Sequence, residues 1–227
     1  GRRNDRGGNA TPSAESGGVP DPTEAYLLRA SFLHQPSLTV RPLLVVIDLN
    51  GTLLFRPGKK DNHSFIERPH ARKFIKYCIN TFHVVIWSSA QPGNVQKMCA
   101  QLLDQDDHAK RVVAAWGRDK FGLSPSDYKR KVQVYKRLTL LWNDPKVQAS
   151  HPNAAQGEVW NQGNTVLIDD STEKARSEPY NAITIPEFLG DPENEDQDVL
   201  PLVHEYLNRL AMVTDVSTYI RVHPFKI

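Results

Sequence analysis

The sequence predicts an α/β domain built on a doubly wound parallel sheet. The prediction rests on two short apolar runs, residues 43–49 and 165–170, that each carry carboxylates at their ends, and on the helical segments that alternate with strand-like ones. An apolar run of this length next to a turn signal is typical of a strand buried on both faces, as in parallel sheets. Strands that alternate with helices are typical of βα units, whose strands pair in parallel.

The expected elements follow one another in a regular order along the chain. A short helix at 24–31 comes first, and strand-like runs then alternate with segments of helical spacing. In the segment 93–104, for example, apolar residues recur every three or four positions, which is typical of a helix with one buried face. The expected strands are 43–49, 83–88, 111–116, 165–170 and 182–185. The expected helices after them are 68–79, 93–104, a lysine-rich 128–142, 172–177 and 197–211.

Composition sets limits on the function. A chain of 227 residues is long enough for one well-packed domain with extensions, and a formal net charge of +2 argues against a strong polyelectrolyte partner for the whole molecule. The two cysteines, Cys78 and Cys99, lack CxxC spacing, so they favour buried apolar roles in a reducing compartment over a zinc site. No apolar run approaches the roughly 20 residues that span a bilayer, so no membrane span is expected.

The first 40 residues differ in composition from the rest. Residues 1–22 are rich in Gly, Ser, Pro and Asn and poor in large apolar residues, which is typical of disorder. We therefore predict an N-terminal arm over 1–40, mostly disordered or bound to a partner, followed by one domain over 41–227. Arg2, Arg3 and Arg6 make the arm's tip basic. This tip is either a solvated tail or a contact with nucleic acid or a partner protein.

Residues suited to phosphate chemistry stand at the ends of three expected strands. Asp48 ends the first and is followed by Gly51, which allows a sharp turn, while Asp169 and Asp170 end the fourth. Ligands of open α/β sheets bind at this edge, so the carboxylates could face one Mg²⁺, and Asp48 could act as a nucleophile toward phosphorus. Ser88 ends the second strand, where its hydroxyl could hold a phosphate oxygen.

Two loops and one arginine are further candidates for contact with a substrate or a partner. The loop 55–65 follows the first acidic strand end and is either a solvated polar loop or a place that binds a phosphorylated substrate. Its basic residues are Arg56, Lys59, Lys60 and His63. The long stretch 143–163 is expected to be a surface excursion, flexible or bound to a partner. Arg118 is expected either to hold a substrate phosphate or to form a surface salt bridge.

In order along the chain, four segments resemble the haloacid dehalogenase (HAD) superfamily of Mg²⁺-dependent aspartyl phosphotransferases. They are Val45 to Leu54, His83 to Ser89, Tyr135 to Leu138 and Thr165 to Ser171. More narrowly, the chain is similar to the protein phosphatases that act on the C-terminal domain of RNA polymerase II. The resemblance implies a HAD-like doubly wound sheet over 41–227 with no large cap domain. An uncapped site would be open and would suit a macromolecular substrate.

The resemblance also implies roles for individual residues. Asp48 would be the nucleophile that becomes a phosphoaspartate, and Thr52 would steady the loop after it. Ser88 and Lys136 would bind the transferred phosphoryl group. The ligands of Mg²⁺ would come from Asp48, the backbone carbonyl of Asn50, Asp169 and Asp170.

Asn50 is the one departure from the family pattern. The family has an aspartate here, which protonates the leaving oxygen and then activates water against the phosphoaspartate. An amide cannot move protons, and loss of a positioned acid and base costs on the order of 10²- to 10⁴-fold in rate. Asn50 therefore fits phosphotransfer without fast hydrolysis, or a substitution introduced to trap substrate.

Three functions remain open from the sequence. The first is a slow or degraded Mg²⁺-dependent Ser/Thr phosphatase that uses Asp48. The second is a pseudophosphatase that binds a protein partner, and the third is an assembly component, for example of a ribonucleoprotein complex. The expected partner is a phosphoprotein or another protein, with nucleic acid as an alternative for the basic arm. We expect an intracellular protein, and the residues do not distinguish nucleus, cytosol and mitochondrion.

Overall fold

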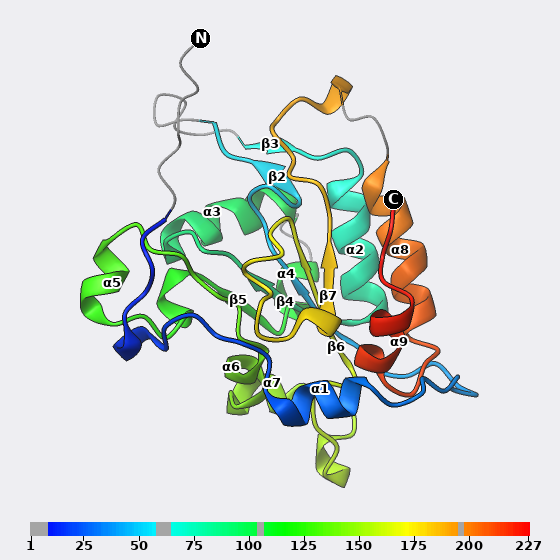
Figure 1. Ribbon diagram of the computed structural model, residues 1–227. Coiled ribbons are helices and arrows are strands. Elements are labelled where there is room, and N and C mark those ends of the chain that lie inside the picture. Colours follow the sequence, from blue (N-terminus) through cyan, green and yellow to red (C-terminus); the bar gives the residue numbers. More distant parts are fainter. Residues whose placement is uncertain (1–8, 58–64, 104–106, 195–197) are drawn as a thin grey trace.

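A five-stranded parallel sheet forms the centre of the computed structural model, which describes residues 9–57, 65–103, 107–194 and 198–227 (Figure 1). The strand order is β5-β4-β1-β6-β7, so the chain builds outward on one side of β1 and then crosses to the other side. Every pairing in this sheet is parallel, which confirms the predicted fold class. The strands are β1 (Leu44–Ile47), β4 (His83–Trp87), β5 (Ala114–Trp116), β6 (Thr165–Asp169) and β7 (Ala182–Thr184).

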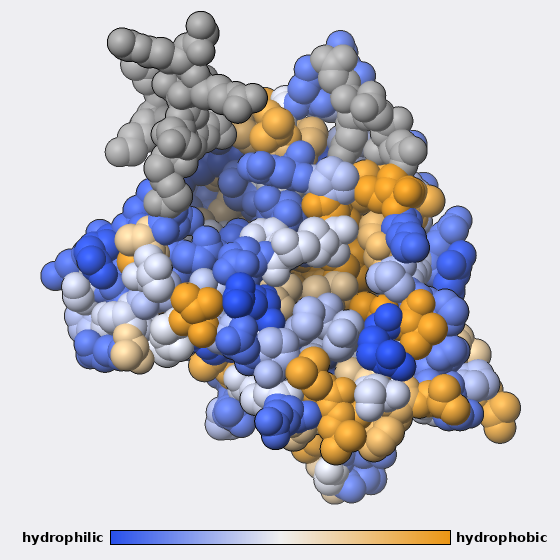
Figure 2. Space-filling model, viewed as in Figure 1, coloured by the Kyte–Doolittle hydropathy of each residue, from blue (hydrophilic) through white to orange (hydrophobic). Residues whose placement is uncertain are grey.

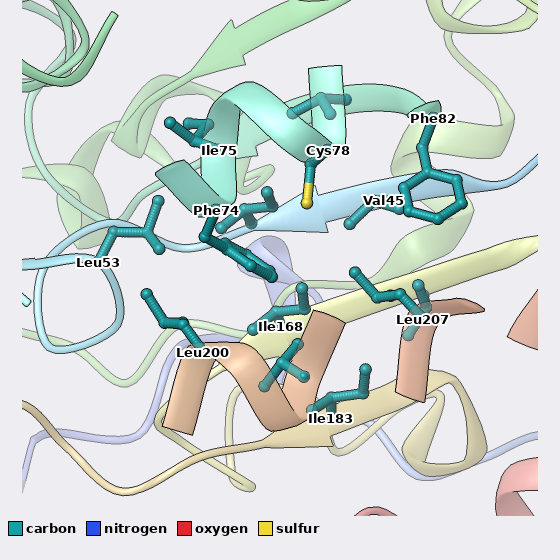
Figure 3. Packing of buried hydrophobic residues seen from close by; sticks show 14 of the residues in the cluster. Val45, Leu53, Phe74, Ile75, Cys78, Phe82, Ile168, Ile183, Leu200 and Leu207 are labelled. Carbon is teal, nitrogen blue, oxygen red and sulfur yellow. The ribbon is translucent and has the colours of Figure 1, made fainter. Parts of the chain in front are cut away.

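Helices cover both faces of the sheet, because successive side chains of a strand point to opposite faces. On one face, Val45 and Ile47 of β1 pack against α2, α3 and α8. Figure 3 shows Phe74 and Cys78 of α2 opposite Leu200 of α8 in this layer. The helices are α1 (Glu24–Ala30), α2 (Ala71–Thr81), α3 (Pro92–Leu102), α4 (His108–Arg111), α5 (Pro125–Lys129), α6 (Leu138–Trp142), α7 (Pro145–Ala149), α8 (Val199–Leu210) and α9 (Val216–Val222).

A small antiparallel hairpin stands beside the carboxyl edge of the sheet. It pairs β2 (Leu54–Phe55) with β3 (Ile66–Glu67) and follows the loop after β1 (Figure 1). Within the described residues, no separate cap domain lies over this edge. Lys59, Lys60 and His63 of the expected substrate loop lie outside the described residues.

The predicted helix 128–142 is wrong in its middle. The structure has α5 up to Lys129 and α6 from Leu138, and residues 130–137 between them form no helix. Val132, Val134 and Lys136 are buried at every second position, as in an extended chain, and Tyr135 between the last two is buried as well. Burial of these side chains overrides the helix propensity of the neighbouring lysines and leucines. The predicted helix 172–177 is also wrong, because these residues form consecutive turns.

The stretch 143–163 is anchored to the domain. It contains α7, and its Trp160 side chain is buried. The side chain of Gln148 donates to the carbonyls of Trp142 and Trp160 and accepts from the Trp160 N–H. The polar residues of this stretch thus satisfy its own backbone, and the expectation that it is flexible or bound to a partner stays a prediction.

The described part of the N-terminal arm lies against the domain. Residues 9–22, here named the strap, run past α5 and lead into α1 (Figure 1). Helix α1 matches the predicted helix and packs through Tyr26, whose hydroxyl donates to Asn181. Its outer face is apolar, with Leu27 and Leu28 exposed, and Figure 2 shows apolar side chains gathered over it. Arg2, Arg3 and Arg6 lie outside the described residues, and the domain boundary at 40 stays a prediction.

None of the described helices combines the length and the hydropathy that a bilayer crossing requires.

Candidate active site

Two acidic strand ends meet at the centre of the sheet's carboxyl edge. Ile47 of β1 is in register with Ile168 of β6, so Asp48 and Asp169, the next residue on each strand, stand at the same level. Carboxylate oxygens of Asp48, Asp169 and Asp170 all lie within 4.8 Å of one another. The apolar strands therefore place three hard oxygen donors in one position, as the sequence suggested.

Lys136 fills the space between two of these carboxylates. Its side chain is fully buried, and its Nζ lies 2.7 Å from Asp48 Oδ1 and 2.6 Å from Asp169 Oδ2. A charged side chain without solvent needs such partners, because burial of an unpaired charge is strongly unfavourable. The lysine thus bridges the expected nucleophile and an expected metal ligand.

Lys174 is a second cation of the site, and the sequence analysis missed it. Its Nζ lies 4.0 Å from Asp169 Oδ1, and its backbone carbonyl accepts from the N–H of Lys136 at 2.7 Å. Burial lowers the pKa of Lys174, but the charges of Asp48, Asp169 and Asp170 outweigh burial, so this pKa lies above its usual value. A lysine soon after the acidic pair was the signal that could have identified it.

The carboxylates of the site differ in their affinity for protons. Burial raises the pKa of Asp48, but the charges of Lys136 and Lys174 outweigh it and hold this pKa below its usual value. Burial and the nearby charge of Asp48 raise the pKa of Asp170 to about 7. Asp48 is therefore ionised at neutral pH, as a nucleophile must be.

Hydrogen bonds fix the loop that follows β1. Thr52 Oγ1 donates to Asp48 Oδ2 at 3.1 Å. The buried guanidinium of Arg68 donates to the carbonyls of Thr52 and Pro186, and the N–H of Phe188 donates to the carbonyl of Gly51. Residues after β3 and after β7 thus hold the loop at the edge of the sheet. Arg68 precedes α2, and its guanidinium also lies over the Phe188 ring, 5.6 Å from the ring centroid.

Gly51 is required at the tightest point of this loop. Its φ is +85°, and a Cβ atom built on it would lie 2.8 Å from Asp170 Oδ2. We expect Gly51→Ala to lower the free energy of unfolding by about 1–2 kcal/mol through backbone strain and also to weaken Mg²⁺ binding by displacing Asp170. Chemical denaturation and Mg²⁺ titration would measure the two effects.

Gly157 provides the matched control for this variant. Its φ is +83°, and nothing lies within 4 Å of an added Cβ. Gly157→Ala should therefore show a similar backbone cost with unchanged Mg²⁺ affinity. Equal Mg²⁺ affinity in both variants would contradict the close contact between Gly51 and Asp170.

The side chain of Asn50 is engaged with the residue that follows β2. This side chain is exposed, and its Oδ1 accepts from the N–H of Arg56 at 2.8 Å. The amide thus fastens the base of the hairpin. The expected roles of Asn50 in catalysis and in metal binding stay predictions.

Ser88 and Arg118 both follow the strands where the sequence placed them, but the contacts of Arg118 differ from those expected. Ser88 is buried directly after β4, the neighbour of β1, and its Oγ accepts from the N–H of Ala90 at 3.2 Å. The guanidinium of Arg118 is engaged by three backbone carbonyls, those of Asp127, Tyr128 and Arg130. Arg118 therefore braces the turn after α5, and the expected phosphate contact finds no support.

The donor set fits a divalent cation with hard oxygen ligands. Asp48, Asp169 and Asp170 offer three carboxylates against the two lysines that contact them, so the described cluster carries excess negative charge when Asp170 is ionised. Mg²⁺ prefers carboxylate and water oxygens of this kind. When bound, it would supply positive charge next to the transferred phosphoryl group.

Comparisons with known proteins agree with this arrangement. Residues 43–217 match the family described as NLI interacting factor-like phosphatase. An FCP1 homology domain-containing protein of Schizosaccharomyces pombe is 35% identical over 219 residues, which cover 92% of this chain and 87% of the relative. A ubiquitin-like domain-containing CTD phosphatase of Arabidopsis thaliana is 26% identical, over 77% of this chain and 48% of the relative, so the chain spans about half of that protein.

A solved structure gives a weaker match. The fission yeast RNA polymerase II CTD phosphatase Fcp1 has a TM-score of 0.42 at 12% identity, over 75% of this chain and 50% of that chain. The family match and the fission yeast relative cover most of the sequence, including both acidic strand ends and Lys136. The chain belongs to the NLI interacting factor-like phosphatases, a HAD family of the FCP1 type.

Proposed function

We propose that this domain is a slow Mg²⁺-dependent phosphatase of phosphoserine and phosphothreonine in proteins, with Asp48 as its nucleophile. The observation that carries the proposal is the buried ion pair of Lys136 with both Asp48 and Asp169. Stability alone does not explain a fully buried lysine between two carboxylates, because isolated buried ion pairs rarely add stability over apolar packing.

The residues would act in the following way. An oxygen of Asp48 forms a bond to phosphorus while the bond from phosphorus to the serine or threonine oxygen breaks, and that oxygen leaves with the electron pair. Lys136, Lys174 and the hydroxyl of Ser88 would hold the oxygens of the transferred group and offset their charge. Asp48, Asp169, Asp170 and the carbonyl of Asn50 would hold Mg²⁺.

Asn50 would limit the rate at both proton transfers. The leaving oxygen needs a proton, and the water that later attacks the phosphoaspartate must lose one. An amide can do neither, so both protons would pass to and from solvent water. This argues for a phosphoaspartate that forms and is then hydrolysed slowly.

A pseudophosphatase is the second candidate, and the position of Asn50 favours it. The exposed amide is engaged with the Arg56 backbone, where it serves the hairpin. In this case the intact cluster would be used to bind a phosphorylated partner. The two candidates share the metal site and differ in turnover.

The substrate class follows from the relatives and from the open edge. Three relatives, the Arabidopsis thaliana protein among them, are named as CTD phosphatases, enzymes that act on a protein. We therefore propose a phosphoprotein as the partner of this site. Nucleic acid remains only an alternative for Arg2, Arg3 and Arg6, outside the described residues.

Cys78 and Cys99 are free thiols, which supports the proposal of a reducing, intracellular compartment.

The metal site can be tested without any assay of activity. We expect millimolar Mg²⁺ to raise the free energy of unfolding, by about 2.7 kcal/mol when its concentration is 100 times the Kd. Asp169→Ala should remove this response, because it removes one of the three clustered carboxylates. Thermal denaturation with and without Mg²⁺ would measure it.

Asp144 offers a matched control for the loss of an aspartate. It caps α7 by accepting from the N–H of Val147 at 3.0 Å and lies outside the acidic cluster. Asp144→Ala should lower stability and keep the full Mg²⁺ response. An unmodified protein that ignores Mg²⁺ would argue against the phosphatase proposal.

A further inference from the structure

The segment that carries Lys136 is hydrogen-bonded to the strap. Residues 130–137, here named the lysine segment, lie outside the helices and the central sheet. At its start, the N–H of Ala10 donates to the carbonyl of Lys131 at 3.2 Å, and the N–H of Gln133 donates to the carbonyl of Ala10 at 2.8 Å. The strap thus pairs with the lysine segment as a single step of parallel ladder.

A buried aspartate fastens the strap just before the lysine segment. Asp127 lies in α5 with a fully buried side chain. Its Oδ2 accepts three hydrogen bonds from the strap: from the N–H of Ser13 at 2.8 Å, from Ser13 Oγ at 2.7 Å and from Ser16 Oγ at 2.6 Å. Arg130 pairs with the other carboxylate oxygen. Hydrogen bonds to a charged acceptor are about twice as strong as neutral ones, so this is the firmest point of the strap.

The strap also holds the residue after Lys136. The guanidinium of Arg137 donates to the carbonyls of Gly17 at 3.0 Å and Gly18 at 2.9 Å. Gly17 has a φ of +85°, and a Cβ on it would lie 2.9 Å from Arg137 Nη2, so only glycine allows this approach. The strap is therefore hydrogen-bonded to the lysine segment near both of its ends, and Lys136 lies between these two contacts.

We propose that the strap is a positioning device for Lys136 and that Asp127 is the residue that anchors it. The Nζ of Lys136 must stay between Asp48 and Asp169, and small displacements at such a site reduce phosphoryl binding sharply. An extended segment without its own secondary structure keeps this position through its neighbours. The role for phosphoryl binding rests on the proposed function, whereas the ordering of Lys136 by the strap does not.

The test removes the hydrogen bonds between the strap and Asp127, first by changing the donors and then by changing the acceptor. Ser13→Ala combined with Ser16→Ala removes two hydroxyl donors, and Asp127→Ala removes the acceptor. We expect hydrogen exchange at the Lys136 N–H, which donates to the carbonyl of Lys174, to rise at least about tenfold in both variants. Exchange in β1 should stay unchanged. Asp127→Asn, which keeps an acceptor oxygen, should show a smaller rise.

A second measurement concerns binding at the site. Beryllofluoride with Mg²⁺ mimics a phosphoryl group on an aspartate, so its affinity reports on Lys136. We expect this affinity to fall at least about tenfold in the double serine variant, because hydrogen bonds to charged groups are worth at least that factor.

Ser31→Ala with Ser37→Ala is the matched control. These hydroxyls also belong to the first 40 residues and donate only to carbonyls close by in the chain, those of Leu28 and Thr39. Neither readout should change in this control. Unchanged exchange at Lys136 in the anchor variants would overturn the proposal. If the unmodified protein binds neither Mg²⁺ nor beryllofluoride, the proposed function fails, and exchange at Lys136 alone decides the role of the strap.

Discussion

Asn50→Asp is expected to raise the turnover of a generic aryl phosphate in Mg²⁺ by roughly 10²-fold or more. The change restores a group that can give a proton to the leaving oxygen and take one from water, at nearly constant side-chain volume. It should not disturb the hairpin, because one carboxylate oxygen can still accept from the N–H of Arg56 as the amide oxygen does. The other oxygen is then available for proton transfer.

The control for this variant is the nucleophile itself. Adding Asp48→Asn to Asn50→Asp should abolish the gained turnover, because an amide cannot form the phosphoaspartate. Steady-state rates and trapping of the phosphoenzyme would measure both. A restored variant that is folded and binds Mg²⁺ yet remains inactive would leave the pseudophosphatase as the better proposal. Brisk turnover by the unmodified protein would instead mean that another group moves the proton.

The sequence was sufficient for the sheet and for the acidic cluster because both follow from short local patterns. The apolar runs that end at Asp48 and Asp169 specify buried parallel strands, and parallel strands bring their carboxyl ends to one edge. Ser88 followed from the same reasoning. Helices α2, α3 and α8 showed regular apolar spacing and were found within a few residues of their ends.

The conformations of the lysine segment and the strap could not be predicted, because contacts between residues far apart in the sequence determine them. The lysines and leucines of 128–142 favour a helix, and the alternation of Val132, Val134 and Lys136 is too short to outweigh that propensity on sequence grounds. The glycines and serines of the strap are typical of disorder, yet Ser13 and Ser16 find a buried acceptor in Asp127, more than 100 positions away. Lys174 was missed because its turn was expected to be a helix.

Lys136→Met is expected to produce the largest loss of stability at the site. The methionine fills similar space without charge, and it leaves Asp48 and Asp169 buried side by side with no bridging cation. Removal of one partner of a buried ion pair costs on the order of 3–5 kcal/mol. Denaturant unfolding at neutral pH without Mg²⁺ would measure it. Lys174→Met should cost less, because Lys174 is partly exposed and stands 4.0 Å from Asp169.

A lower pH and added Mg²⁺ should each reduce the difference in the free energy of unfolding between Lys136→Met and the unmodified protein. In the unmodified protein the pKa of Asp48 is held below its usual value, so the stability that Asp48 contributes is present above that usual value and is lost as pH falls through the lowered pKa. In the variant the buried carboxylates favour the protonated form, so stability returns as pH falls. Mg²⁺ supplies charge at the same place and should stabilise the variant more than the unmodified protein. A variant as stable as the unmodified protein at neutral pH would show that Lys136 is not needed to offset the buried charges of Asp48 and Asp169.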